Sequence, residues 1–183
     1  MANTEHKESL DFLDILSVCL YRLGISVFAF GLIAMTISGL HLIEGSAFYD
    51  RNVLLLIAIA GVLTAANIHV YSKTVRTVIS WSTWVGLLFM VSDPDLSRVW
   101  LSLGFVFVTF SGVALKESFC FKVPGLKAVP VLLAIATFAF CFEILTVATI
   151  ATGLSGLIMG FLSISKWRMP LHFDIGIKAN YEV

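Results

Sequence analysis

The chain has 183 residues, of which 58% are hydrophobic and 13% are charged. A soluble domain is usually about 45–50% apolar and about 25% charged, so this composition indicates a chain whose solvent is lipid. Twelve Lys and Arg residues balance twelve Asp and Glu residues, which gives no reason to expect nucleic acid as a partner. Cys19, Cys120 and Cys141 have no short spacing, which argues against a disulfide framework and a zinc motif.

Residues 1–22 are predicted to form a cytoplasmic N-terminal segment. Within it, Glu8, Asp11 and Asp14 recur every three residues, and acidic residues favour the start of a helix. This pattern predicts either an amphipathic helix at the membrane interface or an ordinary lead-in to the first span, and we favour the lead-in. The apolar run that follows is too long for the hydrophobic region of a cleavable signal peptide, so we expect the first helix to be retained.

Apolar runs of nearly transmembrane length follow one another along the chain. A bilayer core of about 30 Å is crossed by about 20 helical residues. Four runs approach this length, and a fifth stretch is too long for one helix and must fold back on itself. They are Leu23–Ile43, Val53–Val70, Val75–Val91, Val99–Leu115 and the long stretch Ala128–Ser165. The sequence therefore predicts an all-α protein with six transmembrane helices in one bundle over residues 23–166.

The turn inside the long stretch is expected at Thr146–Gly153, with Cys141–Glu143 as the alternative. The last span then presents a face of small residues, on which another helix can approach closely. This face consists of Gly153, Gly156, Gly160 and Ser163. We expect it to pack within the molecule rather than to form a dimer.

Six spans place both termini and the second and fourth loops on one side of the membrane. The other side then has only two basic residues, Arg51 and Arg98. The first side has the remaining ten: Lys7, Arg22, Lys73, Arg76, Lys116, Lys122, Lys127, Lys166, Arg168 and Lys178. The positive-inside rule therefore predicts that both termini are cytoplasmic, together with the tail at 167–183. The loop Lys116–Lys127, which we name the hinge segment, is cytoplasmic in this arrangement.

Three residues near the opposite side are candidates for ion chemistry. His41 and Glu44 stand three positions apart at the end of the first span, and Glu143 is expected toward the same side. An imidazole and two carboxylates could bind a divalent metal or pass protons. A carboxylate inside the bilayer costs about 2.5–3.5 kcal/mol, which makes it a functional candidate. Alternatively, His41 and Glu44 lie among headgroups and Glu143 lies at the turn. We favour this second interpretation and expect no metal or cofactor.

In the hinge segment, Cys120 stands between Phe119 and Phe121. Lys116 and Lys122 could lower the pKa of its thiol and make it reactive, or they could hold an anionic lipid headgroup. A third interpretation is a cysteine packed at the interface, with lysines that serve topology alone, and we favour it. The chain contains no GxGxxG, P-loop, HExxH or GxSxG motif, so we expect no enzyme activity.

Two short motifs resemble those of a known family. Lys116–Phe121, reading KESFCF, is similar to the "KE-x-F-C-F/Y" loop of a family of prokaryotic integral membrane proteins named domain of unknown function 2301. Asp174–Lys178, reading DIGIK, resembles the family's C-terminal "DIG-x-K" stretch, although the residues after the lysine depart from it. The resemblance implies a multi-pass protein of a prokaryotic inner membrane, with the hinge segment and tail on one face. It implies no activity.

These observations predict a non-enzymatic membrane subunit or assembly factor, with the lipid bilayer and another membrane protein as partners. The expected contact surface lies on the hinge segment and the tail, and its candidates are Lys116, Glu117, Phe119, Cys120, Phe121, Asp174 and Lys178. One alternative is a small transporter or a proton or metal conduit that uses Glu143 with His41 and Glu44. Another is a thiol-dependent enzyme that uses Cys120.

Overall fold

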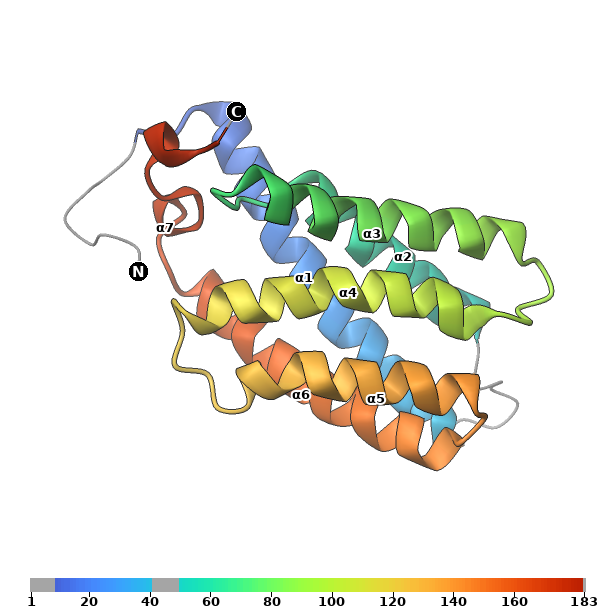
Figure 1. Cartoon of the computed structure of the whole chain (residues 1–183). Helices are drawn as coiled ribbons and strands as arrows, with labels where there is room; N and C mark the ends of the chain where they lie inside the picture. Colours follow the sequence, from blue (N-terminus) through green and yellow to red (C-terminus); the bar gives the residue numbers. More distant parts are fainter. Residues whose placement is uncertain (1–8, 41–49, 183) are drawn as a thin grey trace.

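A computed structural model describes residues 9–40 and 50–182, so His41 and Glu44 lie outside the described residues. Within these ranges the chain is all-α, as predicted. The α-helices are α1 (Phe12–Gly39), α2 (Arg51–Ala66), α3 (Lys73–Ser92), α4 (Val99–Ser118), α5 (Val129–Cys141), α6 (Leu145–Trp167) and α7 (His172–Ile175), with 3-10 turns at Leu126–Ala128 and Lys178–Asn180 (Figure 1).

Helix lengths divide the apolar helices into two groups. By length and composition, α1, α3, α4 and α6 can cross a membrane, whereas α2 and the apolar helix Leu126–Cys141 are shorter. The 16 residues of α2 rise about 24 Å, which is less than a bilayer core of about 30 Å. The predicted run Val53–Val70 is cut short because Asn67 leaves the helical conformation. Helix length therefore gives four candidate spans among the described residues and does not confirm six.

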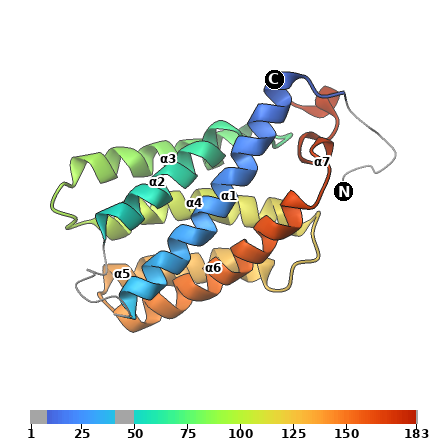
Figure 2. The ribbon, with the colours of Figure 1, turned by 180° about the vertical axis from the view of Figure 1, so that it is seen from behind.

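Six of the helices form two layers of three. Figure 1 shows α3, α4 and α5 side by side, and Figure 2, from behind, shows α2, α1 and α6 side by side. Consecutive helices run in opposite directions, with α1 and α4 in the middle of their layers. Phe28 of α1 stacks on Phe110 of α4 with ring centroids 3.5 Å apart, and meets Phe107 edge-on at 6.0 Å. These buried rings join the two layers at their centre.

This alternation gathers four segments at one end of the bundle, which we name the hinge end. They are the start of α1 and residues 67–72, 119–128 and 168–182 (Figure 1). Lys178 of the tail contacts Asp14 near the start of α1, and the backbone N–H of Glu182 donates to the carbonyl oxygen of Tyr71 at 3.0 Å. The hinge segment and the tail therefore share one face of the protein, as predicted.

The first helix has a capping box at its start. Asp14 N–H donates to the Asp11 carboxylate at 2.8 Å, and Asp11 N–H donates to the Asp14 carboxylate at 3.0 Å. Each carboxylate satisfies a backbone donor that the helix itself leaves unpaired. The helix then continues to Gly39 without a break. Asp11 and Asp14 thus cap the start of α1, and the boundary predicted at residue 22 falls inside this helix.

The turn between the last two long helices was predicted at the wrong place. Residues 142–144 join α5 to α6, so the alternative turn is confirmed and the turn at Thr146–Gly153 is wrong. Glu143 is exposed in this turn and has a left-handed backbone, with φ 57°. Thr149 and Thr152 donate their hydroxyl hydrogens to carbonyl oxygens four residues earlier. This bonding lets threonines remain inside a helix, because their polar groups need no water.

The small-residue face of α6 packs against α1. A Cβ atom at Gly156 would lie 3.1 Å from Cβ of Leu32, and one at Gly153 would lie 3.1 Å from Cγ2 of Thr36. Near the other end of this face, the hydroxyls of Ser163 and Ser26 hydrogen-bond at 2.7 Å. The predicted packing of this face within the molecule is therefore confirmed.

We expect Gly24→Ala to destabilise the bundle. A Cβ at Gly24 would lie 3.0 Å from both the carbonyl oxygen of Ala60 and the backbone nitrogen of Thr64, so α1 and α2 would have to separate. Such overpacking costs about 1–3 kcal/mol. At Gly160, a Cβ would lie 4.0 Å from Ala29, which is an ordinary contact. Thermal unfolding in detergent should show a lower midpoint for Gly24→Ala and no fall for Gly160→Ala. Equal midpoints would contradict the close approach of α1 to α2.

Candidate functional site

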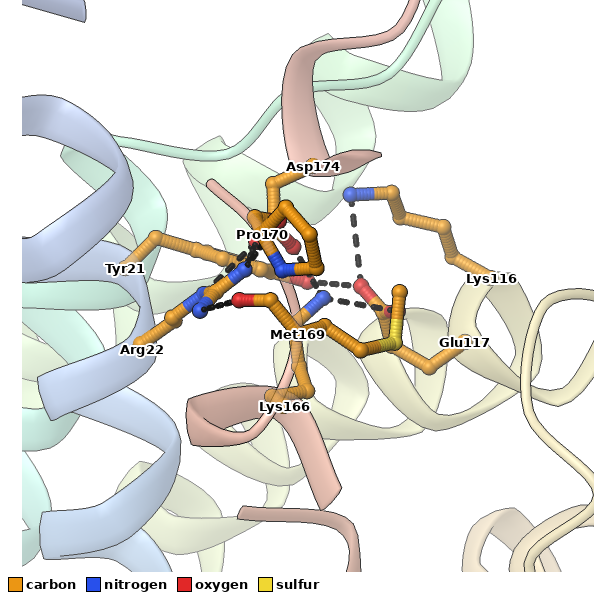
Figure 3. A network of polar contacts seen from close by, with 8 residues as sticks. All are labelled: Tyr21, Arg22, Lys116, Glu117, Lys166, Met169, Pro170 and Asp174. Atoms are coloured by element: carbon orange, nitrogen blue, oxygen red, sulfur yellow. Dashed lines mark hydrogen bonds and ion pairs between the residues drawn. The ribbon is translucent and has the colours of Figure 1, made fainter. Parts of the chain in front are cut away.

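Five charged side chains meet inside the hinge end and form what we name the charge cluster: Arg22, Lys116, Glu117, Lys166 and Asp174 (Figure 3). They come from α1, α4, α6 and the tail. All except Lys116 are buried, with 2–8% of their surface exposed. Charges this deeply buried must be paired, since each loses the solvation that water provides.

Arg22 holds the tail where it leaves α6. Its Nε donates to Asp174 at 2.7 Å, and its Nη2 lies 2.5 Å from the same carboxylate oxygen. Its two terminal nitrogens also donate to the carbonyl oxygens of Met169 and Pro170, at 2.8 and 3.0 Å. Figure 3 shows these acceptors around one guanidinium group. The planar fork of an arginine suits such convergence, because it presents five donors in fixed directions.

Lys166 and Glu117 connect α6 to α4. Lys166 Nζ lies 2.8 Å from Glu117 Oε2 and also contacts Asp174 Oδ1. The other oxygen of Glu117 accepts the hydroxyl hydrogen of Tyr21 at 2.7 Å. The Tyr21 ring in turn faces the ammonium groups of Lys116 at 4.7 Å and Lys166 at 5.1 Å, which adds a cation–π attraction. The two carboxylates thereby bind three helices and the tail together.

The positions of the two lysines follow from the helices that present them. Lys116 and Lys166 stand in the last turns of α4 and α6. Cations are favoured there because the free carbonyl oxygens give the C-terminal end of a helix a partial negative charge.

A close contact with Tyr71 fixes the tail on the loop between α2 and α3. Gly176 has φ 69°, and a Cβ there would clash with the Tyr71 ring. The Tyr71 hydroxyl accepts the backbone N–H of Ile177 at 2.9 Å. Arg76 donates to the carbonyl oxygen of Glu182 at 3.0 Å. Only glycine adopts this left-handed backbone readily and leaves room for Tyr71, which explains the glycine of the DIG sequence.

Two pockets open beside the charge cluster. The hinge pocket, of about 610 Å³, is lined by lysines, by apolar side chains and by the two carboxylates of the charge cluster. The lining includes Lys116, Lys122, Lys166, Glu117, Asp174, Phe119, Phe121 and Phe173. The tail pocket, of about 260 Å³, is lined by His69, Cys120, Tyr181 and others, and shares Lys116 with the first. Burial, and then the nearby Lys116 ammonium, lower the pKa of His69 to about 4. His69 is therefore neutral at neutral pH.

Comparison with known proteins identifies the family. The chain is 37% identical, over 183 residues and 100% of both chains, to an uncharacterized protein of Haemophilus influenzae. A model of a family described as uncharacterized integral membrane protein (DUF2301) matches residues 90–183, which include the hinge segment and the tail. The chain belongs to the DUF2301 family. The resemblance seen in the two motifs is thus confirmed, and no solved structure matches this DUF2301 protein.

The contact candidates of this DUF2301 chain divide into two groups. Phe119, Cys120 and Lys178 are exposed, and Lys116 and Phe121 are half-buried. Glu117 and Asp174 are buried in the charge cluster, so their placement on a contact surface is wrong. They are buried because they neutralise Arg22 and Lys166, and their contacts join the hinge segment to the tail.

Sequence reasoning missed Tyr21, Arg22 and Lys166 as members of the site. Arg22 and Lys166 counted only toward membrane orientation. The available signal was their position at the ends of long apolar runs, where an ionisable group requires a partner. The identity of each partner is a tertiary property, since Arg22 and Asp174 are 152 positions apart.

The residues considered for ion chemistry do not come together in the described structure. Glu143 lies in an exposed turn at the end opposite the charge cluster, and His41 and Glu44 lie outside the described residues. Within residues 9–40 and 50–182, no group of three His, Cys, Asp or Glu side chains is placed to hold a metal ion. Glu143 is therefore not buried among packed helices, and the cost of a buried carboxylate gives no reason to assign it a function.

We expect Asp174→Asn to destabilise this DUF2301 protein strongly. The change leaves Arg22 and Lys166 without one of their carboxylates, and removing one partner of a buried pair costs about 3–5 kcal/mol. The matched control is Lys178→Gln in the same tail, where the ion pair with Asp14 is 42% exposed on the lysine side. Exposed pairs contribute about 0–1 kcal/mol. Thermal unfolding in detergent checks both, and a small effect of Asp174→Asn would contradict a structural role for the cluster.

Proposed function

We propose that the protein crosses the inner membrane of a prokaryote six times, with both termini in the cytoplasm. Four helices of spanning length and two shorter apolar helices support this topology. A bilayer can thin locally around a short helix at a modest cost. The alternating helix directions and the ten basic residues that the sequence assigns to the side of the termini support the orientation.

We propose that its function is that of a non-enzymatic membrane subunit or assembly factor that presents the hinge end to another membrane protein. The observation that supports this best is the exposure of the hinge segment next to the charge cluster, which fixes its position. Phe119 is 73% exposed and stands two residues after the buried Glu117, which the charge cluster holds in place. An aromatic side chain on a rigid support is a favourable contact residue, because little conformational entropy is lost when it binds.

The thiol-dependent enzyme remains the alternative, since Cys120 and His69 line the same pocket. The pKa of His69 is lowered to about 4, and this weakens the enzyme hypothesis. A free thiol has a pKa of about 8.5, so such a histidine is a poor acceptor for its proton. The conduit is disfavoured because Glu143 lies in an exposed turn. Ready alkylation of Cys120 at neutral pH would support the enzyme over the subunit.

Thiol labelling tests the topology. In a chain whose native cysteines are replaced by serine, we expect Glu143→Cys to react with a membrane-impermeant maleimide in intact cells. Lys122→Cys should react only after the cells are opened, because the hinge segment is cytoplasmic. Labelling of Lys122→Cys in intact cells would overturn the orientation.

Site-specific photocrosslinking tests the contact surface. We expect p-benzoylphenylalanine in place of Phe119 to give a discrete protein adduct in intact cells. The matched control is Phe138 on α5, which is 65% exposed and should face lipid. An adduct at position 119 alone supports the subunit function. An adduct of twice the chain's mass would identify the partner as a second copy, and no adduct at position 119 would contradict the proposal.

A further inference from the structure

The charge cluster contains one positive charge more than its carboxylates can balance. Glu117 is occupied by Tyr21 and Lys166, and Asp174 is occupied by Arg22 and Lys166. Arg22 and Lys166 thus balance the two acids. Lys116 is the surplus cation.

The ammonium group of Lys116 is buried and has unused donors. Its Nζ makes no hydrogen bond within the described part of the chain. It lies 3.3 Å from Glu117 Oε1 and faces the ring of Tyr21. Figure 3 shows it approaching Glu117 from the side opposite Arg22. An ammonium group has three donors, and buried donors without acceptors are costly. Lys116 lines both pockets, so a bound group there can meet these donors.

The lining of the hinge pocket indicates the chemistry of that group. Three lysines, Lys116, Lys122 and Lys166, outnumber the two carboxylates of the lining, Glu117 and Asp174, which are paired within the charge cluster. Phe119, Phe121 and Phe173 provide apolar walls. A volume of about 610 Å³ falls within the range of about 300–1,000 Å³ that is common for ligand sites. Lysines bind phosphate as point charges, and basic pockets between helices at the membrane surface suit acidic headgroups. We propose that the hinge pocket binds an anionic phosphate group, either on an acidic phospholipid or on a soluble phosphate compound.

This inference goes beyond the proposed contact function and does not depend on it. Binding is measured on the purified full-length protein in neutral detergent, where no partner protein is present. Failure of photocrosslinking and failure of phosphate binding are therefore separate results.

The test uses dihexanoyl phosphatidylglycerol, dihexanoyl phosphatidylcholine and inorganic phosphate as probes, with isothermal titration calorimetry and the thermal unfolding midpoint as readouts. A ligand that binds only the folded protein raises the midpoint with concentration. We expect saturable binding of phosphatidylglycerol and none of phosphatidylcholine. Saturable binding of inorganic phosphate as well would assign the site to phosphate in general, and its absence would assign the site to a lipid. No binding by either anion, or equal binding of both lipids, overturns the proposal.

Three variants locate the site. Lys116→Gln leaves two cations facing two acids, so we expect it to fold and to lose about tenfold or more in affinity. Lys127→Gln, an exposed lysine of the same segment outside the pocket, should bind like the wild type. Lys122→Gln removes an exposed lysine of the pocket and should weaken binding, which keeps the test valid if Lys116→Gln fails to fold. Wild-type affinity in all three variants would overturn the proposal.

Discussion

The ion pairs of Arg22 and Lys166 with Asp174 and Glu117 are the contacts on which the hinge end depends. Each of these charges loses its water when the helices pack, and each recovers that free energy from the others and from a few hydrogen bonds to neighbouring groups. The partners lie on α1, α4, α6 and the tail, so the ends of three helices and the tail must meet in one arrangement. Such a cluster defines geometry more than it adds stability, because pairing roughly repays the cost of desolvation.

Away from this end, the bundle is held by apolar packing and close helix approach. Phe28 and Phe110 stack between the two layers, and the glycines of α6 allow α1 to come near. Lipid tails are as apolar as these side chains, so helix association in a membrane relies on close packing and hydrogen bonds. The ion pairs between described residues lie at the hinge end, where the exposed Phe119 and the surplus cation Lys116 are also found. The proposed contact surface and the proposed phosphate site both follow from this concentration.

Predictions from the sequence were correct where a residue pattern is compatible with a single structure. Long apolar runs predicted helices, and the glycines of α6 predicted close packing within the molecule. They failed where the same stretch of sequence is compatible with two different structures. The turn was expected at Thr146–Gly153, yet the Thr149 and Thr152 hydroxyls in this range bond within α6. Glu117 and Asp174 were contact candidates because they belong to the hinge segment and the tail, yet each is buried against a cation far away in sequence.

By itself, the sequence determined the class of the protein, the shared face of the hinge segment and tail, and membership of the DUF2301 family. Composition and periodicity are local properties, and they report the solvent that a chain requires. Only the tertiary structure decided that Arg22 meets Asp174, that Lys166 bridges two acids and that Lys116 is left in surplus. Pairing over such separations depends on how helices pack, because any cation along the chain could in principle neutralise either acid.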